Sequence, residues 1–164
     1  MTKHLILGLM LCSLFSCKET PPTPGDPNNP PVYTKEDLKK LRWVEGNWKS
    51  EVAGPGFYQT YAFTSDTTLD ILSYQFDGKD TSGSNTTKLY WSNNHIYMGV
   101  NKEWVATLLT DKQLFLSPVR SGWHTISWIY DAKKGEWTAE HKRPDFIRTI
   151  KMKAQAPLKE LLKK

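Results

Sequence analysis

Cysteine is almost absent from this chain of 164 residues: only Cys12 and Cys17 occur, and both lie near the N-terminus. The sequence after Cys17 has no thiol, which excludes disulfides, thiol catalysis and thiolate metal ligands in that region. A domain folded from that sequence must therefore be held together by its hydrophobic core.

A hydrophobic run long enough to cross a bilayer, about 20 residues, is also missing. The apolar stretch 5–11 is much shorter and follows Lys3 and His4, as in a secretory signal peptide. This pattern predicts a signal peptide over residues 1–16.

Residues 14–17 read LFSC. This tetrapeptide resembles the lipobox of bacterial lipoproteins, and the resemblance implies cleavage before Cys17 and lipidation of its thiol. The next residue is Lys18 and not aspartate, which by resemblance to Gram-negative sorting implies the outer membrane. The alternatives are the inner membrane and an ordinary signal peptide with an incidental cysteine.

Proline is scarce in most of the chain, because six of the ten prolines lie in residues 18–33. Such a segment, with little apolar content, favours an extended tether over a packed core. The sequence therefore predicts a lipidated cysteine and tether over 17–33. The remaining residues, 34–164, have the usual length of one domain.

A strong charge of one sign is lacking as well. The formal net charge is +5 and falls to +4 when Lys3 is removed with the signal peptide. The positive charges are spread along the chain without the dense basic stripe that is typical of nucleic-acid-binding proteins. We expect no nucleic-acid partner, membrane contact through the lipid anchor only, and a monomer.

Motifs for catalysis and cofactors are missing too. The sequence has no Gly-x-Ser-x-Gly elbow, phosphate-binding loop, dinucleotide-binding fingerprint or EF-hand loop. The histidines after Cys17 are His95, His124 and His141, and no two of them have metal-ligand spacing. We expect no enzyme activity, no metal and no cofactor.

One short helix is predicted at residues 34–41, with Thr34 as the N-cap and Asp37 at the third helical position. A second short amphipathic helix is predicted over 157–164. Ten β-type runs lie between them, separated by Asp, Asn, Gly and Pro. The runs are 42–50, 57–65, 68–77, 86–92, 95–100, 103–110, 113–119, 123–130, 136–142 and 146–154.

These runs predict an all-β protein, because short turns between consecutive strands favour antiparallel pairing. We expect an up-and-down β-barrel of about 8–10 strands, since closure removes exposed strand edges. A flattened barrel or a two-sheet sandwich would have the same sequence signature.

The first predicted strand contains LRWVEGNWKS, residues 41–50. Alternation along a strand places Val44, Gly46 and Trp48 on one face, with Trp48 pointing inward and Gly46 leaving room beside it. A helix, this Gly-x-Trp stretch and many short strands resemble the lipocalin-like and fatty-acid-binding-protein-like (calycin) barrels, and most closely bacterial lipocalin-like lipoproteins.

The resemblance implies that Gly46 and Trp48 close one end of a barrel that holds a small hydrophobic or amphiphilic ligand. The sequence departs from these families in three ways. It cannot form the disulfides of secreted lipocalins, and it has room only for a turn over 51–57, where fatty-acid-binding proteins have two helices. It also has Arg148-x-Ile150 where those proteins have Arg-x-Tyr.

Alternation also predicts which side chains face the interior of the barrel. Trp137 and His141 share one face of their strand, and Arg148 lies among apolar residues on the inward face of the next. The faces of 123–130 stay ambiguous. The predicted ligand-binding residues are Arg148, His141, Trp104, Trp137 and Trp128.

Each of these assignments has an alternative. Arg148 could reach the rim and pair with a carboxylate, and the tryptophans could simply fill the core. The resemblance also leaves haem binding through His141 or His124 open. A filled barrel would instead favour a module that docks an envelope protein, so a cavity above about 300 Å³ favours ligand binding. A strongly shifted pKa of His141 or of a glutamate inside the cavity would favour an enzyme.

Overall fold

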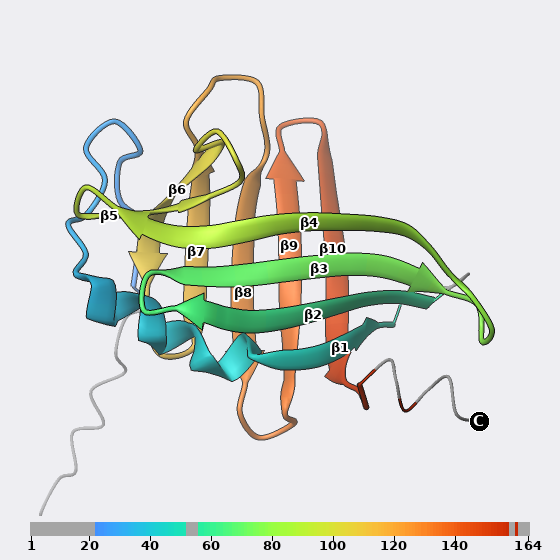
Figure 1. Cartoon of the computed structure of the whole chain (residues 1–164). Helices are drawn as coiled ribbons and strands as arrows, with labels where there is room; N and C mark the ends of the chain where they lie inside the picture. Colours follow the sequence, from blue (N-terminus) through green and yellow to red (C-terminus); the bar gives the residue numbers. More distant parts are fainter. Residues whose placement is uncertain (1–21, 52–55, 158–159, 161–164) are drawn as a thin grey trace, which may run out of the picture.

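The computed structural model describes residues 22–51, 56–157 and 160, which form one 3-10 helix, η1, and ten β-strands (Figure 1). The elements are η1 (Lys35–Val44), β1 (Gly46–Ser50), β2 (Gly56–Ser65), β3 (Thr68–Phe76), β4 (Thr81–Ser92), β5 (His95–Met98), β6 (Trp104–Leu109), β7 (Gln113–Pro118), β8 (Thr125–Asp131), β9 (Glu136–Arg143) and β10 (Phe146–Ala154). The predicted signal peptide, Cys17 and all of the C-terminal helix except Pro157 and Glu160 lie outside the described residues.

The strands form a closed antiparallel barrel in which each strand pairs with its neighbours in sequence. β1 closes the barrel by pairing with β10, with Trp48 opposite Ala154 and Ser50 opposite Met152. Figure 1 shows β1–β4 crossing in front of β7–β10, with η1 at one end and the β9–β10 turn at the other. The all-β, up-and-down barrel predicted from the sequence is confirmed, and this architecture is consistent with a calycin-like fold.

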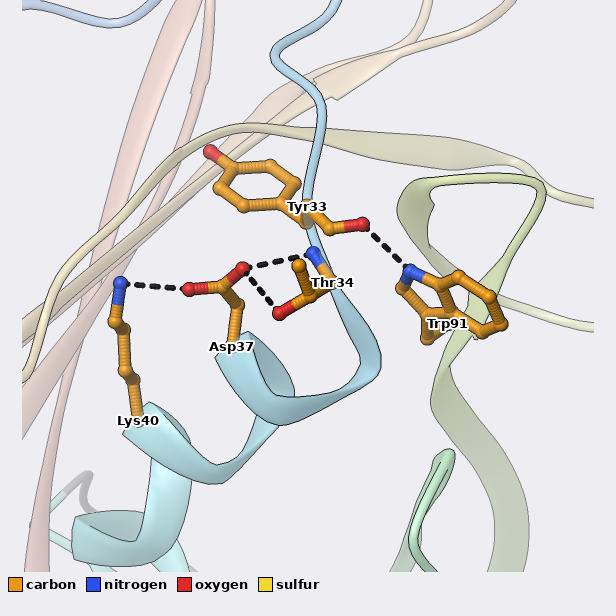
Figure 2. A network of polar contacts seen from close by, with 5 residues as sticks. All are labelled: Tyr33, Thr34, Asp37, Lys40 and Trp91. Atoms are coloured by element: carbon orange, nitrogen blue, oxygen red, sulfur yellow. Dashed lines mark hydrogen bonds and ion pairs between the residues drawn. The ribbon is translucent and has the colours of Figure 1, made fainter.

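A hydrogen-bonded cap starts η1, as the sequence predicts (Figure 2). Asp37 Oδ2 accepts hydrogen bonds from the backbone N–H of Thr34 at 2.7 Å and from its hydroxyl at 2.8 Å. Lys40 Nζ lies 2.8 Å from the other oxygen of the Asp37 carboxylate. These contacts lower the pKa of Asp37, mainly through the hydrogen bond with Lys40. The N-terminus of η1 is therefore fixed by partners inside its own first turns.

The helix is longer than predicted and ends at Val44, so the first strand begins at Gly46 and not at residue 42. Leu38, Leu41 and Val44 are all fully buried. Their spacing of three matches the three residues per turn of a 3-10 helix, so the three side chains line up on one face. The placement of Val44 on the first strand was therefore wrong.

Gly46 owes its place to its backbone and not to the space beside Trp48. Its φ is +123°, a conformation that L side chains rarely adopt, and a Cβ built there would meet nothing within 4 Å. Glycine lets the chain turn from the end of η1 into β1. The expectation that Gly46 leaves room for Trp48 was therefore wrong: the position requires glycine for its backbone conformation.

Trp48 points inward, as predicted, with 6% of its surface exposed. Its indole N–H donates to the carbonyl oxygen of Val44 at 2.6 Å. Its ring packs edge-on against Trp137, with the ring centroids 6.1 Å apart. Trp48 thus joins the end of η1 to the aromatic core of the barrel.

β4 begins at Thr81, five residues before the predicted start. The prediction missed this first half because its residues do not alternate in polarity. Residues 81–86 are all exposed and polar or glycine, so the sequence reads as a turn. The backbone nevertheless pairs with β3, with Ser82 opposite Gln75 and Thr81 opposite Phe76. Strand pairing extends here beyond the region where one face is buried.

The described part of the predicted tether, residues 22–33, contacts the barrel. The backbone N–H of Gly25 donates to Thr107 O at 2.8 Å, and that of Tyr33 donates to Asn94 O at 2.7 Å. The indole N–H of Trp91 donates to the Tyr33 carbonyl at 2.7 Å (Figure 2). Tyr33 is buried, so this proline-rich segment enters the domain through its last residue.

In the part of the chain that the structure describes, no helix is both long and apolar enough to cross a membrane.

Candidate functional site

A cavity of about 370 Å³ lies inside the barrel. Its wall is mostly apolar and comes from β2, β3, β4, β5, β8, β9 and β10. The volume falls in the usual range for small-molecule pockets, roughly 300–1,000 Å³. The barrel is therefore not completely filled by its own side chains.

The inward faces predicted for the last two strands are confirmed. Trp137 and His141 on β9 line the cavity, as do Arg148, Ile150 and Met152 on β10. The ambiguity over residues 123–130 is resolved as well. The inward face carries His124, Ile126 and Trp128.

Trp128 and Trp137 form the aromatic part of the wall together with Tyr61. The centroids of the two indole rings are 5.2 Å apart, and Tyr61 lies edge-on to both at 5.6 and 5.7 Å. All three side chains are buried, so the same aromatic groups fill the core and line the cavity. The indole N–H of Trp137 has no hydrogen-bond partner within the described residues.

Trp104, a predicted ligand-binding residue, does not line this cavity. Its indole N–H donates to the carbonyl oxygen of His124 at 2.8 Å. Its ring centroid lies 5.4 Å from that of His124 and 4.9 Å from that of Trp123. Trp104 therefore supports the segment that places His124 at the cavity.

Basic side chains gather near the β9–β10 turn. Arg148 and His141 are direct register partners on β10 and β9. The rings of His141 and His124 have centroids 4.9 Å apart. Arg148 is exposed and both histidines are half-buried, so this group forms the mouth of the cavity.

Both histidines at the mouth are shifted toward the neutral form. Burial lowers the pKa of His141 to about 4, with further lowering by the nearby His124 and Arg148. Burial and the charge of Arg143 lower the pKa of His124. At neutral pH the mouth therefore holds guanidinium charge beside two neutral imidazoles.

No carboxylate among the described residues forms an ion pair with Arg148. The ion pairs found in this part of the chain all involve other cations, and the cavity lining contains no Asp or Glu. Arg148 does reach the rim, as one alternative held, but without the carboxylate partner which that alternative assumed. Its five N–H donors are available to a ligand.

A short polar chain interrupts the apolar wall. The Tyr61 hydroxyl donates to Gln59 Oε1 at 2.8 Å, and Gln59 Nε2 donates to Ser73 Oγ at 3.0 Å. Burial raises the pKa of Tyr61 well above its ordinary value, so this hydroxyl stays protonated. Gln59 and Tyr61 carry no sequence motif, and only the pairing of β2 with its neighbours reveals their position.

Strongly shifted pKa values inside a cavity can mark a catalytic site, so the remaining chemistry of the cavity matters. A catalytic imidazole needs a nucleophile to activate and a group to orient it. The described lining residues include no serine, cysteine or carboxylate. No group of three potential metal ligands occurs in the described ranges. Among the described lining residues, hydroxyl groups come only from Tyr61 and Thr87.

No protein-family model, curated protein or solved structure matches this chain.

Proposed function

We propose that this protein is a lipid-anchored, lipocalin-like lipoprotein of the bacterial envelope that binds one small amphiphilic anion in its barrel. The observation that supports the proposal is the cavity of about 370 Å³, apolar inside and lined at its mouth by Arg148 without a carboxylate partner in the described chain. The ligand tail would lie against the aromatic wall, and its acidic headgroup would lie at Arg148.

The two ends of the cavity favour different parts of such a ligand. Apolar surface transferred from water contributes roughly 25 cal/mol per Å², so a tail gains from Trp128, Trp137 and Ile150. A guanidinium binds a carboxylate or phosphate through two parallel hydrogen bonds. A neutral lipid gains only the first contribution, so affinity should depend on the headgroup.

Calorimetric titration of the full-length chain with decanoate and decanol tests this role. Replacing Arg148 with Met keeps most of the side-chain length and removes the donors. Decanoate affinity should then fall by about 1.5–3 kcal/mol, the usual contribution of a charged hydrogen bond, while decanol affinity stays the same.

Lys151→Met is the matched control, because Lys151 lies on the outward face of the same strand and also carries one positive charge. Equal decanoate affinity in the Arg148→Met protein and the wild type would reject the headgroup role.

The anchor rests on the LFSC sequence before Lys18. We expect Cys17→Ala to abolish lipid labelling and to move the protein from the membrane fraction to the soluble fraction. Cys12→Ala should leave both unchanged, since Cys12 would be removed with the signal peptide. Membrane fractionation and lipid labelling of the Cys17→Ala protein at wild-type levels would contradict the anchor.

A docking module for an envelope protein is the second candidate. An open groove on the outside of the barrel is lined by Phe115, Trp123, Lys142 and Ile147, among others. Trp123 and Ile147 are 45% and 61% exposed, which is unusual for large apolar side chains. Absence of binding by either decyl ligand, together with an envelope protein crosslinked at Trp123, would favour this function.

A further inference from the structure

Three basic side chains lie at the mouth of the cavity, His124, His141 and Arg148, and Arg143 lies beside them, where it lines the outer groove. The Arg143 guanidinium lies 4.7 Å from the ring centroid of Phe146, whose ring lies 6.5 Å from that of His124. His124 and His141 are 4.9 Å apart, and Arg148 is the register partner of His141. Three different segments bring these groups together.

Negative charge near this cluster is sparse in the described chain. Asp145 Oδ1 lies 3.8 Å from Arg143 Nε, and both side chains are largely exposed, so the pair is weak. The polar residues that β2 and β4 contribute to the cavity are neutral, Gln59 and Thr87. Lys142 adds further positive charge on the outside, where it lines the groove. The cluster therefore has an excess of positive charge.

A headgroup with one negative charge would neutralise only part of this positive charge. A carboxylate is satisfied by the two parallel hydrogen bonds of a single guanidinium, here Arg148. A phosphate monoester carries about −1.5 to −2 charges at pH 7 and three strong acceptor oxygens. It could contact Arg148 and both imidazoles at once, with Arg143 near the outer side.

We propose, on the basis of the proposed function, that the His124–His141 pair makes the site selective for amphiphiles whose headgroup is a doubly charged phosphate monoester. Each imidazole can take up a proton when the dianion is present, which converts a neutral group into a cationic donor. Desolvation and the neighbouring cations oppose this proton in the free protein, and the bound dianion offsets that opposition.

The test compares four ligands by calorimetry with the full-length chain at pH 7.5: decyl phosphate, decyl sulfate, decanoate and inorganic phosphate. Decyl sulfate has the tetrahedral shape of the phosphate but only one charge. We expect decyl phosphate to bind at least about tenfold more tightly than decyl sulfate or decanoate, which corresponds to 1.4 kcal/mol. Inorganic phosphate should bind far more weakly, because it has no tail.

A second arm identifies the histidines. The charge of decyl sulfate does not change between pH 7.5 and 5, so a rise in its affinity at pH 5 reports protonation of the protein. We expect this rise in the wild type and in His95→Gln, because His95 lies away from the cavity and contacts Pro31. His124→Gln and His141→Gln should reduce both the rise and the preference for phosphate over sulfate.

The outcomes separate this inference from the proposed function. Equal binding of the three decyl anions, or an unchanged phosphate preference in both histidine variants, overturns the selectivity and leaves an amphiphile-binding barrel. Inorganic phosphate binding as tightly as decyl phosphate would show a free-anion site. Absence of binding by every decyl ligand removes the proposed function itself. The ligand comparison uses wild-type protein, so it does not depend on how well the variants fold.

Discussion

Trp48 connects the end of η1 to the barrel through its hydrogen bond to Val44 and its contact with Trp137. Replacing it with Ala would remove a nearly fully buried indole and leave a hole beside Trp137. We expect Trp48→Ala to lower the free energy of unfolding by about 3–5 kcal/mol, the usual range for such truncations. Urea denaturation followed by circular dichroism measures this change.

Trp123→Ala is the control for Trp48, because Trp123 is 45% exposed and packs mainly on the ring of Trp104. It should cost clearly less than Trp48→Ala, because the Trp123 side chain has much less apolar surface to lose from the interior. Similar losses in the two variants would contradict the role of Trp48 at the closed end of the barrel.

His141 links stability to pH. Burial lowers its pKa in the folded protein from the ordinary 6.5 to about 4. As the pH falls, the unfolded chain, in which His141 has its ordinary pKa, therefore binds a proton before the folded protein does. The folded state therefore loses stability between pH 6.5 and 4, and this loss stops below pH 4. One proton limits the slope to about 1.4 kcal/mol per pH unit.

The measurement is thermal or urea unfolding at pH 4, 5, 6 and 7 for the wild type, His141→Gln and His95→Gln. We expect a smaller acid-side loss in His141→Gln and a wild-type loss in His95→Gln. Identical pH profiles for all three proteins would show that His141 titrates as an ordinary exposed histidine.

At the scale of elements, the sequence predicts the ten strands well because turn-forming residues separate them. The turn residues at 93–94, 111–112 and 132–135 all lie between strands in the structure. The faces of β9 and of the second half of β10 are also predicted correctly, because polar and apolar residues alternate over 136–140 and 150–153.

Other elements were not predictable, for physical reasons. On β6 three successive residues, 105–107, are all buried, and a register shift follows Ala106, so alternation cannot say where Trp104 points. His124 shares a face with Ile126 and Trp128, but the opposite face of 123–130 also carries apolar residues, so alternation cannot say which face points inward. The contacts of Gly25 and Tyr33 are backbone hydrogen bonds to distant residues, which leave no trace in composition. The sequence thus predicts Arg148 and His141 at the mouth of the cavity, but not the place of Trp104 or the contacts of Gly25 and Tyr33.

At the scale of the whole molecule, the two ends of the barrel have different chemistry. The end near η1 is closed by Leu38, Leu41 and Val44, all fully buried. The cavity mouth near the β9–β10 turn carries Arg148, with His141 half-buried beside it. A ligand with an apolar tail and an acidic head fits this polarity in one orientation only, with the tail toward the helix.

Native mass spectrometry of the full-length protein purified from bacterial envelopes shows whether the barrel carries a ligand, and solvent extraction then identifies that ligand. We expect one bound amphiphile per chain, with an acidic headgroup, in the wild type and in Lys151→Met. The same species should be largely lost from Arg148→Met. Protein without any ligand in all three samples, or a neutral lipid retained equally by all three, would contradict the binding of an acidic amphiphile at Arg148.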